Sequence, residues 1–313
     1  MPTGANATTL GTLEGLLPKP IAKKILVNAY KESVIGRLSG TDPMPITGSS
    51  IAFQTGKPVA GVVGEGDLKP VVESKPTVKT TKPIKVAATM YWSKEARQAN
   101  PVAYLTYLQD SAKDAIRRAI DMAVIHGKNA LNGNAIAGVE GLVSTASSVE
   151  LGTTGKADGG IVGDILAGYK LAVGQDSDFS GFAAAKTFRP DLLSATDTYG
   201  RPIFSSANAA GGVDLRNPMG TLLGVPIGFS DAVAGKLGAV ADSKVRLIGG
   251  DFQEGIVFGY VEQINLRKSD TATIVDGETT VHLFQQNMEA FIVEAQFGWV
   301  IRDVNRFVKY TVK

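Results

Sequence analysis

The feature that most constrains this chain is a long stretch of alternating side chains at residues 78–92. Mostly apolar residues occupy one parity of the stretch, whereas lysines and threonines dominate the other. Because successive side chains of a β-strand point to opposite faces, the alternation predicts one long strand with two different faces. Pro76 and Pro83 cannot donate a backbone hydrogen bond to a neighbouring strand, so we expect the outer part of this strand to form an exposed edge.

A second extended segment precedes this strand. Ile51 and Phe53 alternate with polar neighbours, and an apolar run continues at residues 59–63. Residues 64–70, between the two segments, include two glycines, which adopt positive φ angles at little cost and therefore favour a turn. We predict a β-hairpin over residues 46–92 that projects from the body of the protein.

A long amphipathic helix follows the hairpin. Asn100 is a good N-cap residue and Pro101 suits the first helical turn, so we expect the helix to begin there. Its end is expected near His126, before Gly127. One side of the helix carries an apolar stripe, made of Leu105, Leu108, Ala112, Ala115, Ala119, Ile120 and Ala123.

Charged residues mark the other side of this helix. Asp114 and Arg118, and likewise Arg117 and Asp121, are four positions apart, which predicts two ion pairs on the solvent-facing side. At 1.5 Å per residue the helix spans roughly 40 Å, long enough to brace a flat subunit from side to side.

Several other segments have simpler patterns. A helix is expected at residues 21–38, in an arm that precedes the hairpin, and another at 161–173. Residues 290–293 are apolar on both faces, as in a central strand, and an alternating strand is expected near residues 308–312. Residues 131–264 as a whole show a mixture of helical and extended patterns.

Composition excludes several classes of protein. The 313 residues are 44% hydrophobic and 20% charged, which is typical of a globular chain. The absence of cysteine excludes disulfides, zinc–thiolate sites and cysteine nucleophiles. A net charge of +2 is too small for a dedicated DNA-binding protein, although nonspecific contact with DNA is compatible with it. With no signal peptide or membrane span in the pattern, we expect synthesis in the cytoplasm.

No pattern of catalytic or metal-binding residues is found in the sequence. His126 and His282 lack metal-ligand spacing, and we expect His126 to be a surface residue stabilised by the helix C-terminus. Residues 176–181 resemble the opening of an EF-hand loop, but Thr187 stands where calcium requires a bidentate carboxylate. A phosphate-binding loop and a nucleophile elbow are also missing. We therefore expect no catalytic residue, cofactor or metal.

Three stretches of the chain resemble the major capsid proteins of tailed bacteriophages, the Hong Kong 97-like family. The most specific is GRPIF at residues 200–204 followed by GTLLGVPI at 220–227, and the others are GGDF at 249–252 and residues 284–308. The resemblance covers nearly the whole chain. It implies an α+β fold with an N-terminal arm (1–45), an extended hairpin called the E-loop (46–92), peripheral segments (93–130, which holds a long spine helix, and 265–313) and an axial domain (131–264).

The resemblance also implies a function. Such a chain self-assembles as pentamers and hexamers into an icosahedral capsid that encloses phage double-stranded DNA, with nonspecific contact between shell and DNA. It is made in the cytoplasm of the host bacterium and becomes part of the virion. Scaffolding, portal and cement proteins are the candidate partners. Some members carry a cleaved scaffolding segment at the N-terminus, and here we expect any scaffolding protein to be separate.

The tip of the E-loop is the expected contact with neighbouring subunits. Its charged residues are Glu65, Asp67, Lys69 and Lys75. In some family members an E-loop lysine forms an isopeptide bond with an asparagine of a neighbour, assisted by a buried glutamate. The resemblance makes Lys69 or Lys75 with Asn287 the candidate pair, but we expect the particles to contain no such crosslink.

Three alternatives remain open from the sequence. An encapsulin-type nanocompartment shares the fold but holds protein cargo, and would need a groove for a cargo peptide near the N-terminal helix. A glycine-rich hydrolase domain would need a catalytic triad or a metal set, which the sequence does not supply. A phage tail-tube subunit is normally shorter and lacks a long spine helix.

Overall fold

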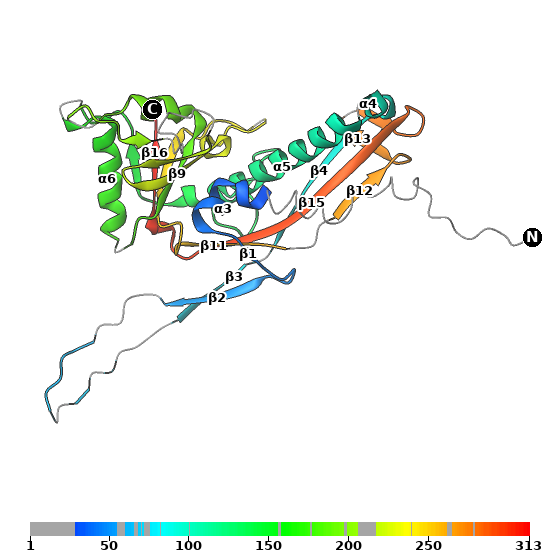
Figure 1. The fold of residues 1–313 in the computed structure, drawn as a ribbon. Helices are drawn as coiled ribbons and strands as arrows, with labels where there is room; N and C mark the ends of the chain where they lie inside the picture. Colours follow the sequence, from blue (N-terminus) through cyan, green and yellow to red (C-terminus); the bar gives the residue numbers. More distant parts are fainter. Residues whose placement is uncertain are drawn as a thin grey trace, which may run out of the picture.

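The computed structural model has an elongated outline, with a thick lobe at one end, a narrow part at the other and a hairpin that leaves the body (Figure 1). It describes residues 29–54, 60–65, 68–69, 71, 76–81, 83–99, 101–155, 158–175, 177–196, 199–205, 217–238, 240–261, 265–277 and 279–313.

A seven-stranded mixed sheet forms the core of the lobe. Its order is β5-β16-β10-β6-β9-β8-β7, made of Ser148–Glu150, Phe307–Thr311, Val245–Gly250, Gly181–Ala185, Val225–Ser230, Met219–Leu222 and Phe204–Ser205. Helix α6 (Ile161–Val173) packs against β16, where the Tyr310 hydroxyl donates to the carbonyl of Ile165 at 2.9 Å. At Gly168 a side chain would collide with the Tyr310 ring, so this helix needs a glycine where it crosses the strand.

A second sheet forms the narrow part. Its central strand is β15 (Met288–Ile301), which pairs on one side with β4 (Ile84–Ser93) and on the other with β11 (Ile256–Tyr260) and β12 (Asn265–Ser269). The short strand β1 (Asp42–Pro43) extends the sheet beyond β11. The central strand predicted at 290–293 is confirmed, because β15 has neighbours on both sides and its side chains are mostly buried.

The remaining elements are short. At the far end of the narrow part lie helix α4 (Lys94–Ala99) and the strand pair of β13 (Thr273–Asp276) and β14 (Thr279–His282) (Figure 1). Helix α7 (Arg189–Ser194) and four 3-10 turns are also short; the turns are η1 (Leu142–Ser144), η3 (Lys186–Phe188), η4 (Asp231–Ala234) and η5 (Val304–Arg306).

The long helix is confirmed as α5 (Pro101–His126), and it runs beside β4 and β15 from the far end to the lobe (Figure 1). Ile116, Ile120 and Val124 lie in one apolar core with side chains of β15. Gly127 ends the helix with a φ of 63°, which glycine adopts without strain. The helix predicted at 161–173 is also confirmed, as α6.

One of the two predicted surface ion pairs on this helix is wrong. Arg118 pairs with Asp114 at 2.7 Å, as expected. Asp121 is completely buried, and its carboxylate accepts a hydrogen bond from Ser230 instead of lying on the solvent-facing side. The reason is that the lobe packs against this end of α5, so every face of the helix is covered there.

The single strand predicted over residues 78–92 is divided in two. Strand β3 (Pro76–Thr81) pairs with β2 (Ser49–Gln54), whereas β4 begins at Ile84 and pairs with β15. Pro83 lies between them and has no amide hydrogen to continue the first ladder. Only the β2–β3 part of the predicted hairpin therefore leaves the body (Figure 1).

The division changes what covers the apolar face of the predicted strand. Ile84, Val86 and Met90 of β4 pack against the subunit's own core, next to α5. The subunit itself therefore covers the apolar face of β4.

The arm helix predicted at 21–38 is interrupted. Residues 29–32 are helical, and α3 (Val34–Ser39) begins after Ser33, while residues 21–28 lie outside the described part of the chain. Ser33 has an extended ψ of 147°, and its hydroxyl accepts a hydrogen bond from the amide of Gly36 at 2.9 Å. This N-cap starts a new helix and explains the break.

Candidate assembly surfaces and the pocket at the arm junction

The base of the β2–β3 hairpin is fixed to the body by Lys79. Its ammonium group donates to the carbonyls of Ile301 at 2.8 Å and Arg302 at 3.1 Å, and lies 3.9 Å from the carboxylate of Glu140. It also lies 5.9 Å from the ring centroid of Phe53 on the partner strand. These contacts hold the direction in which the hairpin leaves the subunit.

The outer part of the hairpin exposes apolar side chains. Val62, Leu68 and Val71 are almost fully exposed to solvent. Glu65 and Lys69, two of the four charged residues expected at the tip, are also exposed, whereas Asp67 and Lys75 lie outside the described residues. The subunit itself leaves these apolar side chains uncovered, and such groups are normally buried in an interface.

Helix α6 has two apolar faces. Val162, Ile165 and Ala172 are buried against the sheet. Leu166, Tyr169 and Val173, spaced three and four residues apart, share one flank of the helix and are 44 to 46% exposed. Leu171, on another side of the helix, is 45% exposed, so α6 presents several apolar side chains to solvent. Helices on a protein surface normally have a polar outer face.

Near the opposite edge of the same sheet, Leu223 lies at the turn between β8 and β9. Its φ is 51°, a left-handed conformation that costs a non-glycine residue roughly 1–2 kcal/mol. The side chain is partly exposed. A strained and exposed leucine at a turn favours a role in contact with a partner over a role in folding.

The far end of the narrow part contains a buried carboxylate. The Glu289 side chain lies 2.9 Å from Arg97 and 2.8 Å from Lys268, and Trp92 donates to it at 3.3 Å. The Glu289 carboxylate thus pairs with two basic side chains and links α4 and β12 to the central strand β15. Asn287, the candidate crosslinking residue, is exposed in the preceding turn, with its amide 3.5 Å from Glu95.

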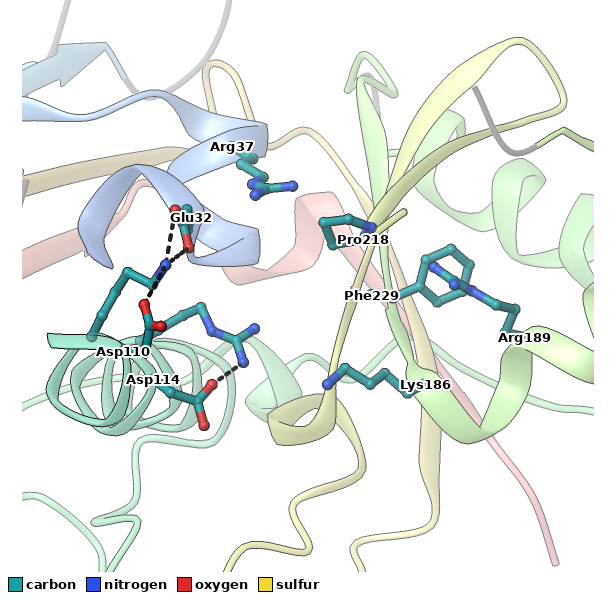
Figure 2. Close-up of a pocket in the computed structure, with 10 residues that line it drawn as sticks. Glu32, Arg37, Asp110, Asp114, Lys186, Arg189, Pro218 and Phe229 are labelled. Carbon is teal, nitrogen blue, oxygen red and sulfur yellow. Dashed lines mark hydrogen bonds and ion pairs between the residues drawn. The ribbon is translucent and has the colours of Figure 1, made fainter. Parts of the chain in front are cut away.

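A pocket of about 670 Å³ lies where the arm, α5 and the lobe meet. It is lined by five cationic side chains, three carboxylates and two apolar residues: Arg37, Lys113, Arg117, Lys186, Arg189, Glu32, Asp110, Asp114, Pro218 and Phe229. Figure 2 shows that Arg37 comes from the arm side, the acidic residues from the arm and α5, and Lys186 and Arg189 from the lobe. No pattern in the sequence predicts this pocket, because its walls come from four segments far apart in the chain.

Asp121 lies beneath this junction. Its carboxylate accepts a hydrogen bond from the Ser230 hydroxyl at 2.8 Å and lies 3.5 Å from the backbone amide of Ile35. Burial raises the pKa of Asp121 to about 6, although the hydrogen bonds and the charge of Arg117 act in the opposite direction. One carboxylate therefore connects α5, α3 and the lobe.

The histidines form no metal site. The Nε2 atom of His126 lies 3.0 and 3.1 Å from the carbonyl oxygens of Ala232 and Val233. The ring is therefore half-buried against η4 instead of lying free on the surface as expected, and burial lowers the pKa of His126. Within the described ranges, no group of three histidine or acidic side chains is arranged to hold a metal ion. In the same part of the chain, no helix has the length and apolarity needed to cross a membrane.

Comparisons with known proteins agree with this architecture. The model of the phage capsid family matches residues 14–312. "Probable major capsid protein gp17" of Mycobacterium phage D29 is 28% identical over 235 residues, 72% of this chain and 68% of that protein. Its counterpart from Mycobacterium phage L5 is 29% identical over 238 residues, with the same coverage. A solved chain from Gordonia phage Cozz has a TM-score of 0.70 at 29% identity, covering 100% of this chain and 97% of that one.

The fold, with its projecting hairpin, long spine helix and uncovered apolar faces, defines a shell-building subunit of the Hong Kong 97-like class. The chain belongs to the phage capsid family. The family, the α+β fold and the function of a phage capsid protein, all predicted from sequence, are confirmed. Capsid proteins are structural components of the virion and assemble into oligomeric shells, and the encapsulin alternative is not favoured.

Proposed function

We propose that this chain is the main shell protein of a tailed phage and assembles as pentamers and hexamers into an icosahedral capsid around double-stranded DNA. The main support for this proposal is the hairpin, which is fixed at its base and exposes apolar side chains farther out. Its base is fixed by Lys79, while Val62, Leu68 and Val71 remain exposed beyond it. Exposed apolar side chains that lie far from the core of their own subunit are stabilised by burial in an interface, and a second copy of the chain would bury them in a closed shell.

The four charged residues at the tip belong to the same proposed interface. Glu65, Asp67, Lys69 and Lys75 carry both signs of charge, so they would form ion pairs around an apolar contact. Exposed ion pairs contribute little affinity, typically below about 1 kcal/mol, but like charges in the wrong register are unfavourable. Their role would therefore be to orient the hairpin on the neighbouring subunit.

A pair of leucine substitutions tests the hairpin. Leu68 and Leu131 are 96% and 82% exposed in the subunit, so replacing either by serine should leave the fold intact. Leu68→Ser should reduce the yield of particles in negative-stain micrographs, because it removes an apolar contact between copies. Leu131→Ser is the matched control and should assemble normally. Equal particle yields from both variants, with equal thermal transitions, would remove the hairpin from the interface.

The lobe would form the contacts around the symmetry axes. The exposed apolar side chains of α6 and the β8–β9 turn at Leu223 form two different surfaces, near opposite edges of one sheet. Two different patches that bind head to tail generate closed rings, whereas one self-complementary patch generates a dimer. We infer that the α6 face of one copy contacts the Leu223 turn of the next copy in each pentamer and hexamer.

The division of the chain follows the same proposal. The arm would be 1–45, the E-loop 46–92, the peripheral part 93–130 and 265–313, and the axial domain 131–264. Strand β4 is better assigned to the peripheral part, because it pairs with β15 along its whole length.

The other proposed partners are scaffolding, portal and cement proteins, with synthesis in the host bacterial cytoplasm. No substrate turnover is part of the proposal. Purified particles should contain nuclease-protected DNA; particles that contain a protein cargo instead would support the nanocompartment alternative.

A further inference from the structure

The pocket at the arm junction holds a cation that no described side chain neutralises. Among the described residues, the guanidinium of Arg37 has no ion pair and no hydrogen-bond partner, and in Figure 2 it points into the pocket. An arginine side chain can place planar, paired donors on a bound oxyanion, which a lysine cannot. The pocket therefore has an anchoring group that the described part of the chain leaves available for a ligand.

The carboxylates of the pocket are already occupied. Glu32 lies 3.2 Å and Asp110 3.8 Å from Lys113, and Asp114 forms ion pairs with Arg117 and Arg118. Lys186 pairs with Asp231 at 2.8 Å on the opposite wall. Five cations and three carboxylates line the space, and even with Asp231 counted the pocket keeps an excess of positive charge.

Arg189 is held in place on the lobe side. Its guanidinium carbon lies 4.1 Å from the centroid of the Phe229 ring, and it donates to the carbonyl of Asn217. Stacking on a buried ring fixes the plane of the guanidinium in advance. A ligand that reaches the pocket therefore meets one fixed guanidinium opposite Arg37.

We propose that this pocket binds a backbone phosphate of double-stranded DNA, with Arg37 as the principal contact. The inference rests on the proposed function, in which the shell encloses DNA. Phosphate oxygens match both the charge excess and the donor geometry of arginine. Contact of this kind positions the nucleic acid without reading its sequence.

The alternative occupant, an acidic segment of another copy, fits less well. Residues 46–92, which contain the projecting hairpin, carry six lysines and three acidic residues, and residues 1–28 carry three lysines and one glutamate. Both segments are therefore net basic. Neither complements a pocket with excess positive charge, so the chain offers no suitable acidic arm of its own.

The test measures binding of a short fluorescein-labelled DNA duplex to the purified full chain by anisotropy, between about 50 and 200 mM KCl. Arg37→Gln should weaken binding about tenfold at the low-salt end, since a charge-assisted hydrogen bond is lost. The slope of log Kobs against log salt should become shallower by about 0.9 for the one phosphate contact removed. Arg37→Lys should keep most of the slope, because it keeps the charge.

Arg267→Gln is the matched control, since Arg267 is an exposed arginine on β12, away from the pocket. It should change neither affinity nor slope. Inorganic tripolyphosphate should compete with the duplex on the wild-type chain and less effectively on Arg37→Gln. Polyglutamate should compete poorly with both; stronger competition by polyglutamate than by tripolyphosphate would assign the pocket to an acidic protein segment and overturn the proposal.

Assembly separates this inference from the proposed function. Arg37→Gln should form shells at the wild-type yield, with an unchanged thermal transition. Equal DNA affinity and slope in Arg37→Gln and the wild type would overturn the phosphate site while shells still form. Loss of shells with unchanged DNA binding would also overturn it, because the pocket would then hold a neighbouring subunit. Failure of the wild-type chain to assemble would count against the proposed function alone.

Discussion

The Asp121 carboxylate accepts a hydrogen bond of 2.8 Å from the Ser230 hydroxyl, and neither side chain is exposed to solvent. The contact joins the long helix α5 to the lobe, directly beneath the arm. Because burial raises the pKa of Asp121 to about 6, the folded state binds a proton there more tightly than an unfolded chain does.

A pH dependence of stability follows from this raised pKa. Between about pH 4 and pH 6 the folded state holds the proton that the unfolded state has lost, so the free energy of unfolding falls as pH rises. The decrease from Asp121 alone is up to about 3 kcal/mol. Urea unfolding of Asp121→Asn should lack this part of the pH dependence, whereas Asp178→Asn, at an exposed position, should retain it. Identical pH profiles for the two variants would contradict the assignment.

Asp164 of α6 should show the opposite dependence. Burial alone would raise its pKa, but hydrogen bonds from Thr154, Gly152 and Thr153 outweigh burial and lower the pKa. The stabilisation from Asp164 is therefore present above the ordinary pKa of an aspartate and lost as pH falls through the lowered value.

Substitution of Asp164 tests its role in fixing α6 to the loop that precedes it. Asp164→Ala leaves two backbone amides, of Gly152 and Thr154, without their acceptor. The expected loss is about 2–3 kcal/mol at neutral pH, measured by urea unfolding. A loss below about 0.5 kcal/mol would show that water replaces the carboxylate without cost.

Leu223→Asn should separate folding from assembly. Asparagine tolerates the left-handed conformation better than leucine does, so the unassembled chain should be as stable as the wild type or more stable. The proposed ring contact loses its apolar side chain, so particle yield should fall. Thermal unfolding and electron microscopy of the same preparation report the two effects. If Leu223→Asn is less stable than the wild type and still assembles at the wild-type yield, both expectations are wrong.

Denatured particles should run as monomers near 32.8 kDa in gel electrophoresis. The buried Glu289 near Asn287 is already engaged in ion pairs with Arg97 at 2.9 Å and Lys268 at 2.8 Å. Isopeptide formation with Lys69 or Lys75 would lack the assistance that the resemblance implies. A ladder of covalent pentamers and hexamers would contradict this expectation.

The sequence predicted the regular elements better than the surfaces between them. The sequence around helix α5 offers an N-cap residue, an apolar stripe and a glycine after the last turn, and all of these are local signals. The apolar residues of β3 and β4 both stand at even-numbered positions, so the alternating pattern runs unbroken from one strand into the next. Only Pro83 indicates in the sequence that the strand is divided there. The four-residue spacing of Arg117 and Asp121 predicts a surface ion pair. The apolar residues at 122–125, which directly follow Asp121, indicate instead that this part of the helix is buried.

The pocket could not be predicted from the sequence. Arg37, Lys113 and Arg189 are far apart in the chain, and only the packing of the arm, α5 and the lobe brings them to one space. Lys186 and Phe229 likewise come from segments without any recognisable binding motif. Sites of this kind depend on tertiary structure rather than on local pattern.

The most direct test of the central claim is negative-stain electron microscopy of the expressed full chain, alone and together with a scaffolding protein from the same genome. We expect closed icosahedral shells, in which each hairpin contacts a neighbouring subunit. Light scattering that gives only a monomeric mass under every assembly condition, with no particles in the micrographs, would contradict it.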